Sequence, residues 1–134
     1  RNFSTSSPRS LASRPSLRSN SPVSRSWPVR VLLDENLPHD LMGLLAGHAV
    51  ETVAVRGWAG VRNGDLLARA GGVFDAFITM DRLLPSQQRI AQLPFGVILI
   101  LAPSNRLAHL QPLVPEVLRV LPAVTAGSLH VVGA

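Results

Sequence analysis

Short apolar runs recur along the chain from residue 29 onward, separated by segments rich in glycine, proline and polar residues. VRVLL (29–33) and GVILILA (96–102) are typical of strands buried in a parallel sheet, and the second is apolar enough to be covered on both faces. AVETVAV (49–55) alternates and is rich in valine, DAFITM (75–80) is a further apolar run, and SLHVV (128–132) is a shorter one. We expect each of them to form a strand, the last at an edge of the sheet.

Helix-start and helix-stop residues lie between these strands. Asn36 and Pro38 are start signals ahead of the stretch DLMGLLAG, and Gly47 is placed to close that helix. After the loop GWAGVRNG, Asn63 is placed to cap the helix GDLLARA, which ends at the glycine pair that follows it. The sequence therefore predicts two short helices, one before and one after the strand AVETVAV.

Two later segments are also expected to be helical. PSQQRIAQL (85–93) follows the strand DAFITM, and a longer helix runs from Asn105 to about Leu121. We expect Pro112 and Pro115 to break the longer helix, because proline lacks the N–H that a helix interior requires. Strands that alternate with helices in units this short predict an α/β fold around a mostly parallel sheet of about five short strands.

Residues 1–28 differ from the rest of the chain. They are rich in serine, arginine and proline, carry no acid and show no apolar periodicity, so we expect them to be disordered. Three interpretations of this segment stay open: an organelle transit peptide, a disordered arm that contacts nucleic acid, and an upstream extension unrelated to the fold. The folded domain is therefore predicted to span residues 29–134.

The charge of the chain is divided unevenly. Residues 1–30 carry six arginines and no acid, whereas residues 31–134 carry seven arginines against eight acids, which gives −1 (7 − 8). The folded part thus lacks the strongly basic surface that is typical of proteins that coat duplex nucleic acid. No cysteine is present, which excludes thiolate metal sites and disulfides, and no apolar run approaches the roughly 20 residues that span a bilayer.

Aspartates follow two of the predicted strands. Asp34 comes after VRVLL and Asp81 after DAFITM, and the carboxyl ends of parallel strands share one edge of a sheet, where α/β proteins bind ligands. Asp65 lies in the first turn of the helix that leads back to DAFITM, so we expect three carboxylates to converge. A hard divalent cation, Mg²⁺ or Mn²⁺, relieves the repulsion between such carboxylates. In that position it would activate water and neutralise charge on a phosphate.

Helix capping is the competing explanation for each aspartate taken alone, because a carboxylate satisfies free N–H groups at the start of a helix. Taken together, at two strand ends and one helix start, the aspartates favour a metal site. Glu35 is either a supporting residue of that site or solvated surface. Asn105, which follows the strand GVILILA, is first of all a candidate helix cap, with a minor role in the site as the alternative.

Arginine, tryptophan and histidine give weaker signals. Arg62, Arg82 and Arg106 lie in the loops nearest the predicted edge and are candidates for contacts to phosphate, with solvated charge as the alternative. Trp58 is more typical of a loop anchor than of a base-stacking platform. The histidines are scattered without metal-ligand spacing, and we expect them to be packed or solvated: His39, His48, His109 and His130.

A phosphoacceptor receiver domain has a similar arrangement of acids. It too carries an acid pair after its first strand and an aspartate after its third, here Asp34, Glu35 and Asp81, and it binds Mg²⁺. Receiver domains, however, hold the phosphoryl group with a lysine after the last strand, and this chain contains no lysine. An arginine does not simply replace that compact point charge, and no arginine follows SLHVV, so the receiver interpretation is set aside.

From Val29 onward the chain resembles the PIN-like nuclease family, specifically its small stand-alone bacterial branch. The segments that carry the resemblance follow one another over nearly the whole folded part: VLLDENLP, RGWAGVRNGDLL, FITMDRLLPSQQ, VILILAPSNRL and PLVPEVL. The resemblance implies a compact three-layer fold with an acidic pocket that binds Mg²⁺ or Mn²⁺ and cleaves phosphodiesters in single-stranded RNA. It also implies a cytoplasmic toxin of a toxin–antitoxin pair, with a small antitoxin as partner and a homodimer as assembly.

The resemblance assigns roles to particular residues. Asp34 corresponds to the acid after the first strand, Asp65 to the helical acid, and Asp81 to the acid of a T-x-D motif whose hydroxyl is that of Thr79. Asn36 is expected to help Thr79 orient the ligands. The expected activity is therefore that of a metal-dependent endoribonuclease, in which these aspartates hold the ion.

One position departs from the family pattern. Many relatives carry a further acid two positions beyond the T-x-D aspartate, and this chain has Leu83 there. The loss leaves one firm metal site rather than two, with Asn36 or Asn105 as neutral oxygen ligands in partial replacement. The alternative function is therefore a degraded PIN-like module that binds RNA or a protein partner without cleaving.

Overall fold

Five parallel strands form a single sheet in the order β4-β3-β5-β6-β7 in the computed structural model, which describes residues 28–133. The strands are β3 (Arg30–Leu33), β4 (Ala49–Thr52), β5 (Ala76–Thr79), β6 (Gly96–Leu101) and β7 (Leu129–Gly133). Every segment predicted to be a strand contains one, and β7 lies at an edge of the sheet as expected. The predicted disorder of residues 1–28 lies outside the described residues, apart from Pro28.

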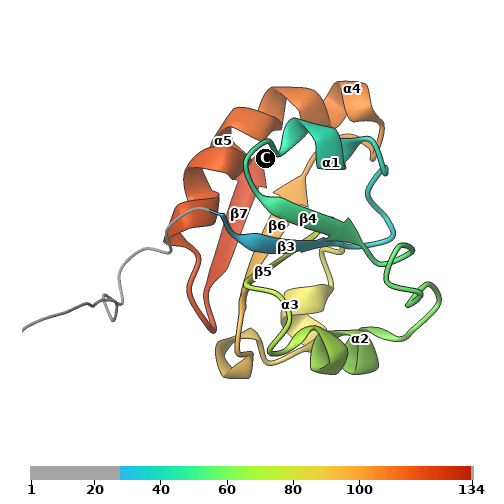
Figure 1. Cartoon of the computed structure of the whole chain (residues 1–134), viewed down its shortest axis with the longest axis vertical. Coiled ribbons are helices and arrows are strands. Elements are labelled where there is room, and N and C mark those ends of the chain that lie inside the picture. The colour runs from blue at the N-terminus through green and yellow to red at the C-terminus, as the bar shows by residue number, and fades with distance from the viewer. Residues whose placement is uncertain (1–27, 134) are drawn as a thin grey trace, which may run out of the picture.

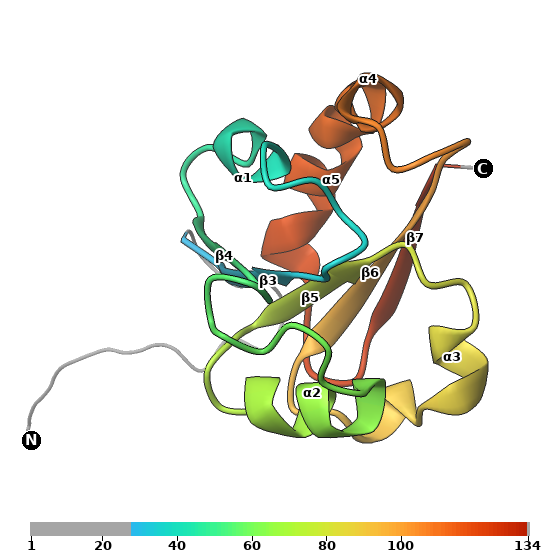
Figure 2. The same cartoon turned by 90° about the vertical axis from the view of Figure 1, so that its right-hand side faces the viewer.

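Helices cover both faces of this sheet, so the predicted α/β architecture is confirmed as three layers. The helices α1, α4 and α5 lie over one face, and α2 and α3 lie over the other (Figures 1 and 2). The α-helices are α1 (Leu41–Leu44), α2 (Asn63–Ala70), α3 (Leu84–Gln87), α4 (Leu107–Leu110) and α5 (Val114–Val120), and the 3-10 helices are η2 (Ile90–Gln92), η3 (Gln111–Leu113) and η4 (Leu121–Ala123). No helix within residues 28–133 has the length and apolar character needed to cross a membrane.

The sheet separates two hydrophobic cores. Successive side chains of a strand point to opposite faces, so Val31 and Leu33 join the core beneath α1 and α5, while Leu32 joins the core above α2. Phe77 and Ile78 divide in the same way on β5. Because both faces are buried, the strand sequences are continuous apolar runs, which is the pattern that identified them.

Two predicted element boundaries are wrong. The first helix begins at Leu41 rather than near Asn36, and Pro38 instead opens a turn in which its carbonyl accepts the N–H of Leu41 (3.1 Å). The strand predicted over 49–55 ends at Thr52, because the Thr52 hydroxyl and carbonyl accept the N–H groups of Val55 (3.0 Å) and Arg56 (3.1 Å) and turn the chain. In both cases a tight turn with its own hydrogen bonds replaces regular structure.

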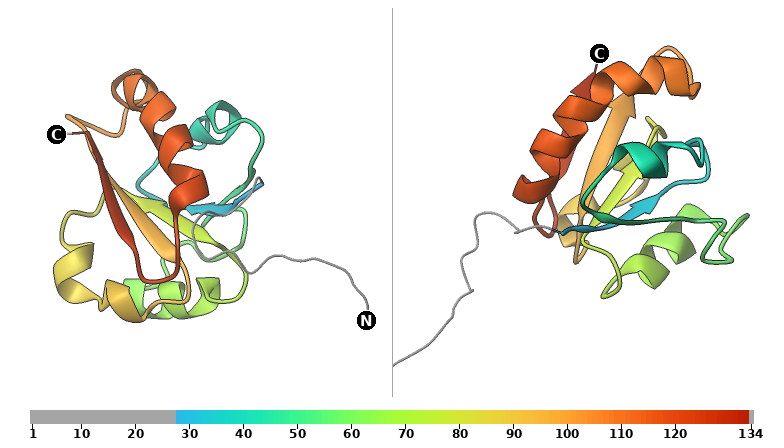
Figure 3. Two further views of the ribbon diagram at one scale, coloured as in Figure 1. Left: turned by 90° about the vertical axis from the view of Figure 1, so that its left-hand side faces the viewer. Right: turned by 45° about the horizontal axis from the view of Figure 1, so that its top comes forward.

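Proline divides the C-terminal helical region, as predicted. Pro112 and Pro115 lie in the first turns of η3 and α5, where the missing N–H costs nothing. The region therefore runs as a chain of short helices from Leu107 to Ala123. Figure 3 shows α5 lying alongside β7, with α4 continuing beyond it. The segment predicted to be helical over 85–93 is also divided, into α3 and η2, by an extended Gln88.

One buried acid joins two strands at their amino ends. Asp75, immediately before β5, accepts the N–H of Arg30 (3.0 Å) and binds its guanidinium through both carboxylate oxygens (3.2 and 3.1 Å). Such two-point binding fixes geometry as well as charge. We therefore assign Asp75 to the stability of the β3–β5 pair, at the opposite end of the strands from the aspartates considered next.

Candidate functional site

The carboxyl ends of β3 and β5 lie side by side, because the two strands pair in parallel with Leu33 opposite Ile78. Asp34 follows β3 directly, and its N–H donates to the carbonyl of Ile78 (2.9 Å), which extends the ladder by one residue. Asp81 follows the last residue of β5 by two positions. The structure thus brings together the strand ends that carry these two aspartates. We call this region the carboxyl edge.

The Asp34 side chain is only 6% exposed, although it carries a carboxyl group. Its Oδ1 accepts the N–H of Glu35 (2.8 Å), and its Oδ2 accepts the hydroxyl of Thr79 (2.7 Å). Burial raises the pKa of Asp34 above its ordinary value; the two hydrogen bonds oppose the rise, and the charges of Glu35 and Asp81 add to it. Negative charge at this position is therefore costly unless a cation is near.

Thr79 links the two aspartates. It is the last residue of β5 and is fully buried. Its Oγ1 donates to Asp34 Oδ2 and accepts the N–H of Asp81 (3.0 Å), so one hydroxyl fixes both groups. Thr79 is thus positioned to orient the Asp34 carboxylate and the backbone of Asp81.

Replacing Thr79 by valine should lower the free energy of unfolding by about 2 kcal/mol, because a buried carboxylate oxygen and the N–H of Asp81 each lose a partner. Urea unfolding followed by circular dichroism measures this change. Thr52→Val is the matched control: Thr52 is also buried, but within residues 28–133 its hydroxyl makes one hydrogen bond, from the N–H of Val55, so its loss should cost about 1 kcal/mol. Equal losses in the two variants would show that Thr79 does not serve the carboxylates.

Asp81 is held from two directions. Its Oδ1 accepts the N–H of Leu83 (3.0 Å), and its Oδ2 accepts Nδ2 of Asn63 (3.1 Å). The sequence predicts Asn63 as a helix cap, and this prediction is wrong: α2 has no side-chain cap, and the amide reaches the aspartate instead. Capping residues are recognised from local sequence, whereas this contact joins residues 18 positions apart. The sequence does not indicate whether the Asn63 amide caps the helix or binds Asp81.

Asp65 lies in the first turn of α2, two residues after Asn63, and its side chain is exposed. Its carboxylate has no hydrogen-bond or ion-pair partner among residues 28–133. Over the same residues, no three side chains of histidine, aspartate or glutamate lie close enough together to hold a metal ion. The structure therefore brings Asp34 and Asp81 together, and it leaves Asp65 on the neighbouring helix turn rather than in a three-carboxylate group.

Other residues of the carboxyl edge tie its loops to one another. Glu35 accepts the N–H of Gly60 at 3.3 and 3.4 Å from its two oxygens, which joins the loop after β3 to the loop before α2. Asn36 Oδ1 accepts the N–H of Met80 (3.4 Å), and the Asn36 carbonyl accepts Nδ2 of Asn105 (3.0 Å). The amide side chains predicted as supporting residues thus hold the edge together by hydrogen bonds, and Asn105 does not cap a helix.

Three arginines near this edge are exposed and lack an acidic partner within the described part of the chain. Arg62 immediately precedes α2, Arg82 follows Asp81, and Arg106 immediately precedes α4. The arginines of residues 28–133 that do form ion pairs lie elsewhere: Arg30 with Asp75, Arg56 with Glu51, and Arg119 with Glu116. Guanidinium groups without a carboxylate partner are available for phosphate.

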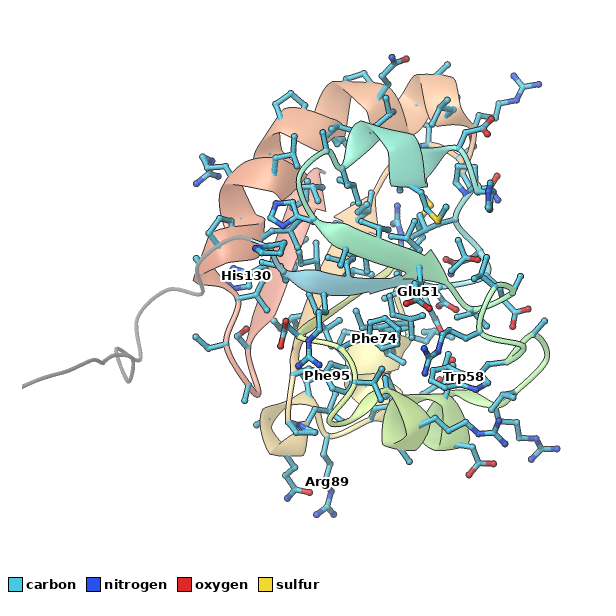
Figure 4. The ribbon with its side chains drawn as sticks, in the orientation of Figure 1. Glu51, Trp58, Phe74, Arg89, Phe95 and His130 are labelled. Atoms are coloured by element: carbon cyan, nitrogen blue, oxygen red, sulfur yellow. The ribbon has the colours of Figure 1, made fainter. Side chains whose placement is uncertain are left out.

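Trp58 anchors a loop, as its sequence context predicted. Trp58 lies beside Phe74 (Figure 4), and the two rings meet edge to face with centroids 6.3 Å apart. The Arg56 guanidinium lies 4.9 Å from the Trp58 centroid. The arginine, in turn, pairs with Glu51 (3.4 Å). The Arg56 guanidinium also lies 5.4 Å from the Phe74 centroid, so Trp58, Phe74 and Arg56 form one cluster, which suits packing of the β4–α2 loop better than base stacking.

The histidines are separate from the carboxylates. His48 Nδ1 accepts the N–H of Val29 (3.0 Å), and His109 Nδ1 lies 2.6 Å from the hydroxyl of Ser104. His39 is exposed, and His130 lies on the edge strand β7 (Figure 4). Among the described residues, none of the hydrogen bonds that His48 and His109 make goes to a carboxylate, and Nε2 of His130 is buried without a hydrogen-bond partner.

The donor atoms of the carboxyl edge define the chemistry that it can support. Asp34 and Asp81 offer hard carboxylate oxygens, each with one hydrogen bond and one further lone pair. Mg²⁺ typically takes one or two carboxylates and completes its shell with water and substrate phosphate. Asp34 and Asp81 are thus of the ligand type that such an ion takes, and residues 28–133 offer no group of three or more ligands that would make a cage entirely of protein.

Comparison with family models, curated proteins and solved structures found no match to this chain.

Proposed function

We propose that the protein is a metal-dependent endoribonuclease that cleaves single-stranded RNA. One observation carries the proposal: two aspartates follow adjacent parallel strands, and the Thr79 hydroxyl donates to the carboxylate of Asp34 and accepts the backbone N–H of Asp81. Parallel α/β sheets bind their ligands at this edge. The choice of RNA, and of single strands, rests on the resemblance of this chain to PIN-like nucleases.

A divalent cation suits this pair of acids. Burial already disfavours charge on Asp34, and the charge of Asp81 adds to that cost. A cation between the two carboxylates offsets both effects. Asp34 and Asp81 would hold Mg²⁺ or Mn²⁺, with Asp65 as the acid nearest to them on α2. When bound, the ion supplies an activated water and neutralises charge that develops on the phosphate.

The remaining residues of the edge position these groups. Thr79 holds Asp34 and the N–H of Asp81 in fixed relation, which limits the directions from which the carboxylates can bind a ligand. Arg82, which follows Asp81 in the chain, would contact the phosphate that is cleaved, and Arg62 and Arg106, exposed just before α2 and α4, would contact neighbouring phosphates. The folded part carries seven arginines against eight acids and so lacks the strongly basic surface typical of proteins that coat a duplex, which favours a single strand as the substrate.

Cleavage of RNA should depend on added metal. Incubation of the full chain with end-labelled single-stranded RNA should give discrete products in Mn²⁺ or Mg²⁺ and none in EDTA. A duplex of the same sequence should be cut more slowly, because the folded part lacks the strongly basic surface with which proteins bind a duplex. Intact RNA in every metal condition would reject the enzymatic proposal.

A binding module without cleavage is the second candidate. Leu83 is 62% exposed at the position where related proteins carry an acid, and no three-carboxylate group is present within residues 28–133. In that case the same assay would leave the RNA intact, while fluorescence anisotropy would detect a complex whose affinity falls with added salt. The small antitoxin and the homodimer implied by the resemblance are proposed partners under either function.

A further inference from the structure

Asn63 makes a contact that its position in α2 does not require. It is the first residue of the helix, preceded by an extended Arg62 (φ −66°, ψ 152°), and its side chain does not cap the helix. Its Nδ2 instead donates to Asp81 Oδ2 across 18 positions of sequence. The amide thus connects the helix layer to the carboxyl edge of the sheet.

The folding of α2 does not depend on this contact. Leu66, Leu67 and Ala70 are buried beneath the sheet and dock the helix through the same core as Phe77. Burial of two leucine side chains contributes far more to docking than one hydrogen bond between half-buried groups. The Asn63 side chain is therefore not needed to dock the helix and can instead hold Asp81 at the carboxyl edge.

The contact has two geometric consequences for the edge. It binds Oδ2 of Asp81, whereas the Leu83 N–H binds Oδ1, so that both oxygens of the carboxylate have a donor. It also fastens the first turn of α2, which carries Asp65, beside Asp81. The Asn63 amide therefore orients the Asp81 carboxylate and keeps the helix turn that carries Asp65 close to it.

We propose that Asn63 is the positioning residue of the metal site: its amide orients Asp81 and holds the Asp65 turn against it. This role rests on the proposed function. Hydrogen-bond partners of metal ligands fix the orientation in which a ligand meets its ion, and their loss typically weakens binding about 10- to 100-fold.

Three variants of the full-length protein test the role by calorimetric titration with Mn²⁺ alone. Asn63→Ala removes the donor and should weaken Mn²⁺ binding about tenfold. Asn63→Asp keeps the shape of the side chain but places a carboxylate beside Asp81. Together with Asp34 and Asp81 it offers the ion a third carboxylate, so this variant should bind Mn²⁺ more tightly than wild type. Gly64→Ala is the matched control, because a Cβ at the adjacent residue meets no atom within 4 Å, and its Mn²⁺ affinity should equal that of wild type.

Unfolding temperatures in EDTA provide a second readout. Asn63→Asp should unfold at a lower temperature than Asn63→Ala, because two like charges then face each other. Wild-type affinity for Mn²⁺ in Asn63→Ala would overturn the positioning role and leave the proposed function intact. A wild-type chain that binds no Mn²⁺ would overturn the proposed function and this role together, and the unfolding temperatures would still decide whether residue 63 faces Asp81.

Discussion

Asp34→Asn should abolish metal-dependent cleavage and, in the same protein, raise the unfolding temperature of the metal-free form at pH 7. Activity is lost because an amide oxygen carries no charge to hold a divalent cation. The cleavage rate should fall at least about 10³-fold, because both the metal ion and the water that it activates depend on this group. Stability rises because the costly burial of a carboxylate disappears. Denaturing gels of labelled RNA and scanning calorimetry in EDTA measure the two effects.

The gain in stability should depend on pH in a defined direction. The pKa of Asp34 is raised in the folded protein, so the folded state binds a proton more readily than the unfolded chain does. The cost of the buried charge is therefore complete above the raised pKa and absent below the ordinary aspartate value of about 4. The difference in unfolding temperature between Asp34→Asn and wild type should accordingly be largest near neutral pH and vanish in acid.

Asp40→Asn is the control for this experiment. Asp40 is exposed at the start of α1 and its side chain makes no capping hydrogen bond, so the substitution should leave cleavage and the unfolding temperature unchanged. Asp81→Asn should also lose cleavage. Cleavage at the wild-type rate by Asp34→Asn, or a lower unfolding temperature than wild type at pH 7, would contradict the assignment of Asp34.

The strands could be predicted because their signal is carried by neighbouring residues. A strand buried on both faces must be apolar at every position, as in β6, and this requirement is visible without any knowledge of the fold. The parallel arrangement then follows from the helices between the strands. Asp34 and Asp81 come to one edge as a direct consequence, since each follows a strand of the same parallel pair.

The rest of the edge depends on contacts between distant residues, which a single sequence does not encode locally. Asn63 has the ordinary properties of a helix cap, and only the folded chain shows that Asp81 competes for its amide. Thr52 ends β4 by turning the chain with its own side chain, although the valines beyond it continue the alternating pattern. The exposed position of Asp65 depends on the angle at which α2 packs against the sheet. The spacing of residues along the sequence does not predict that angle.

Gly96→Ala should lower the free energy of unfolding by about 3 kcal/mol, at the upper end of the usual cost of overpacking a core. Gly96 begins β6, and a Cβ there would overlap Val124 Cγ1 and lie 2.7 Å from the Ser128 hydroxyl and 2.8 Å from the Thr125 carbonyl. Urea unfolding followed by tryptophan fluorescence measures the loss, with Gly64→Ala as the control that adds a methyl in open space.

The neighbours of Gly96 have little freedom to move away. The Ser128 hydroxyl donates to the Thr125 carbonyl (2.7 Å) and accepts the Thr125 N–H (3.1 Å), and the Ser128 carbonyl accepts the N–H of Val97 (2.9 Å) as β7 joins β6. Relief of the overlap would break this turn or shift the edge strand that it starts. A loss below about 1 kcal/mol would mean that the turn yields easily, and that β7 is held by its strand pairing rather than by the turn before it.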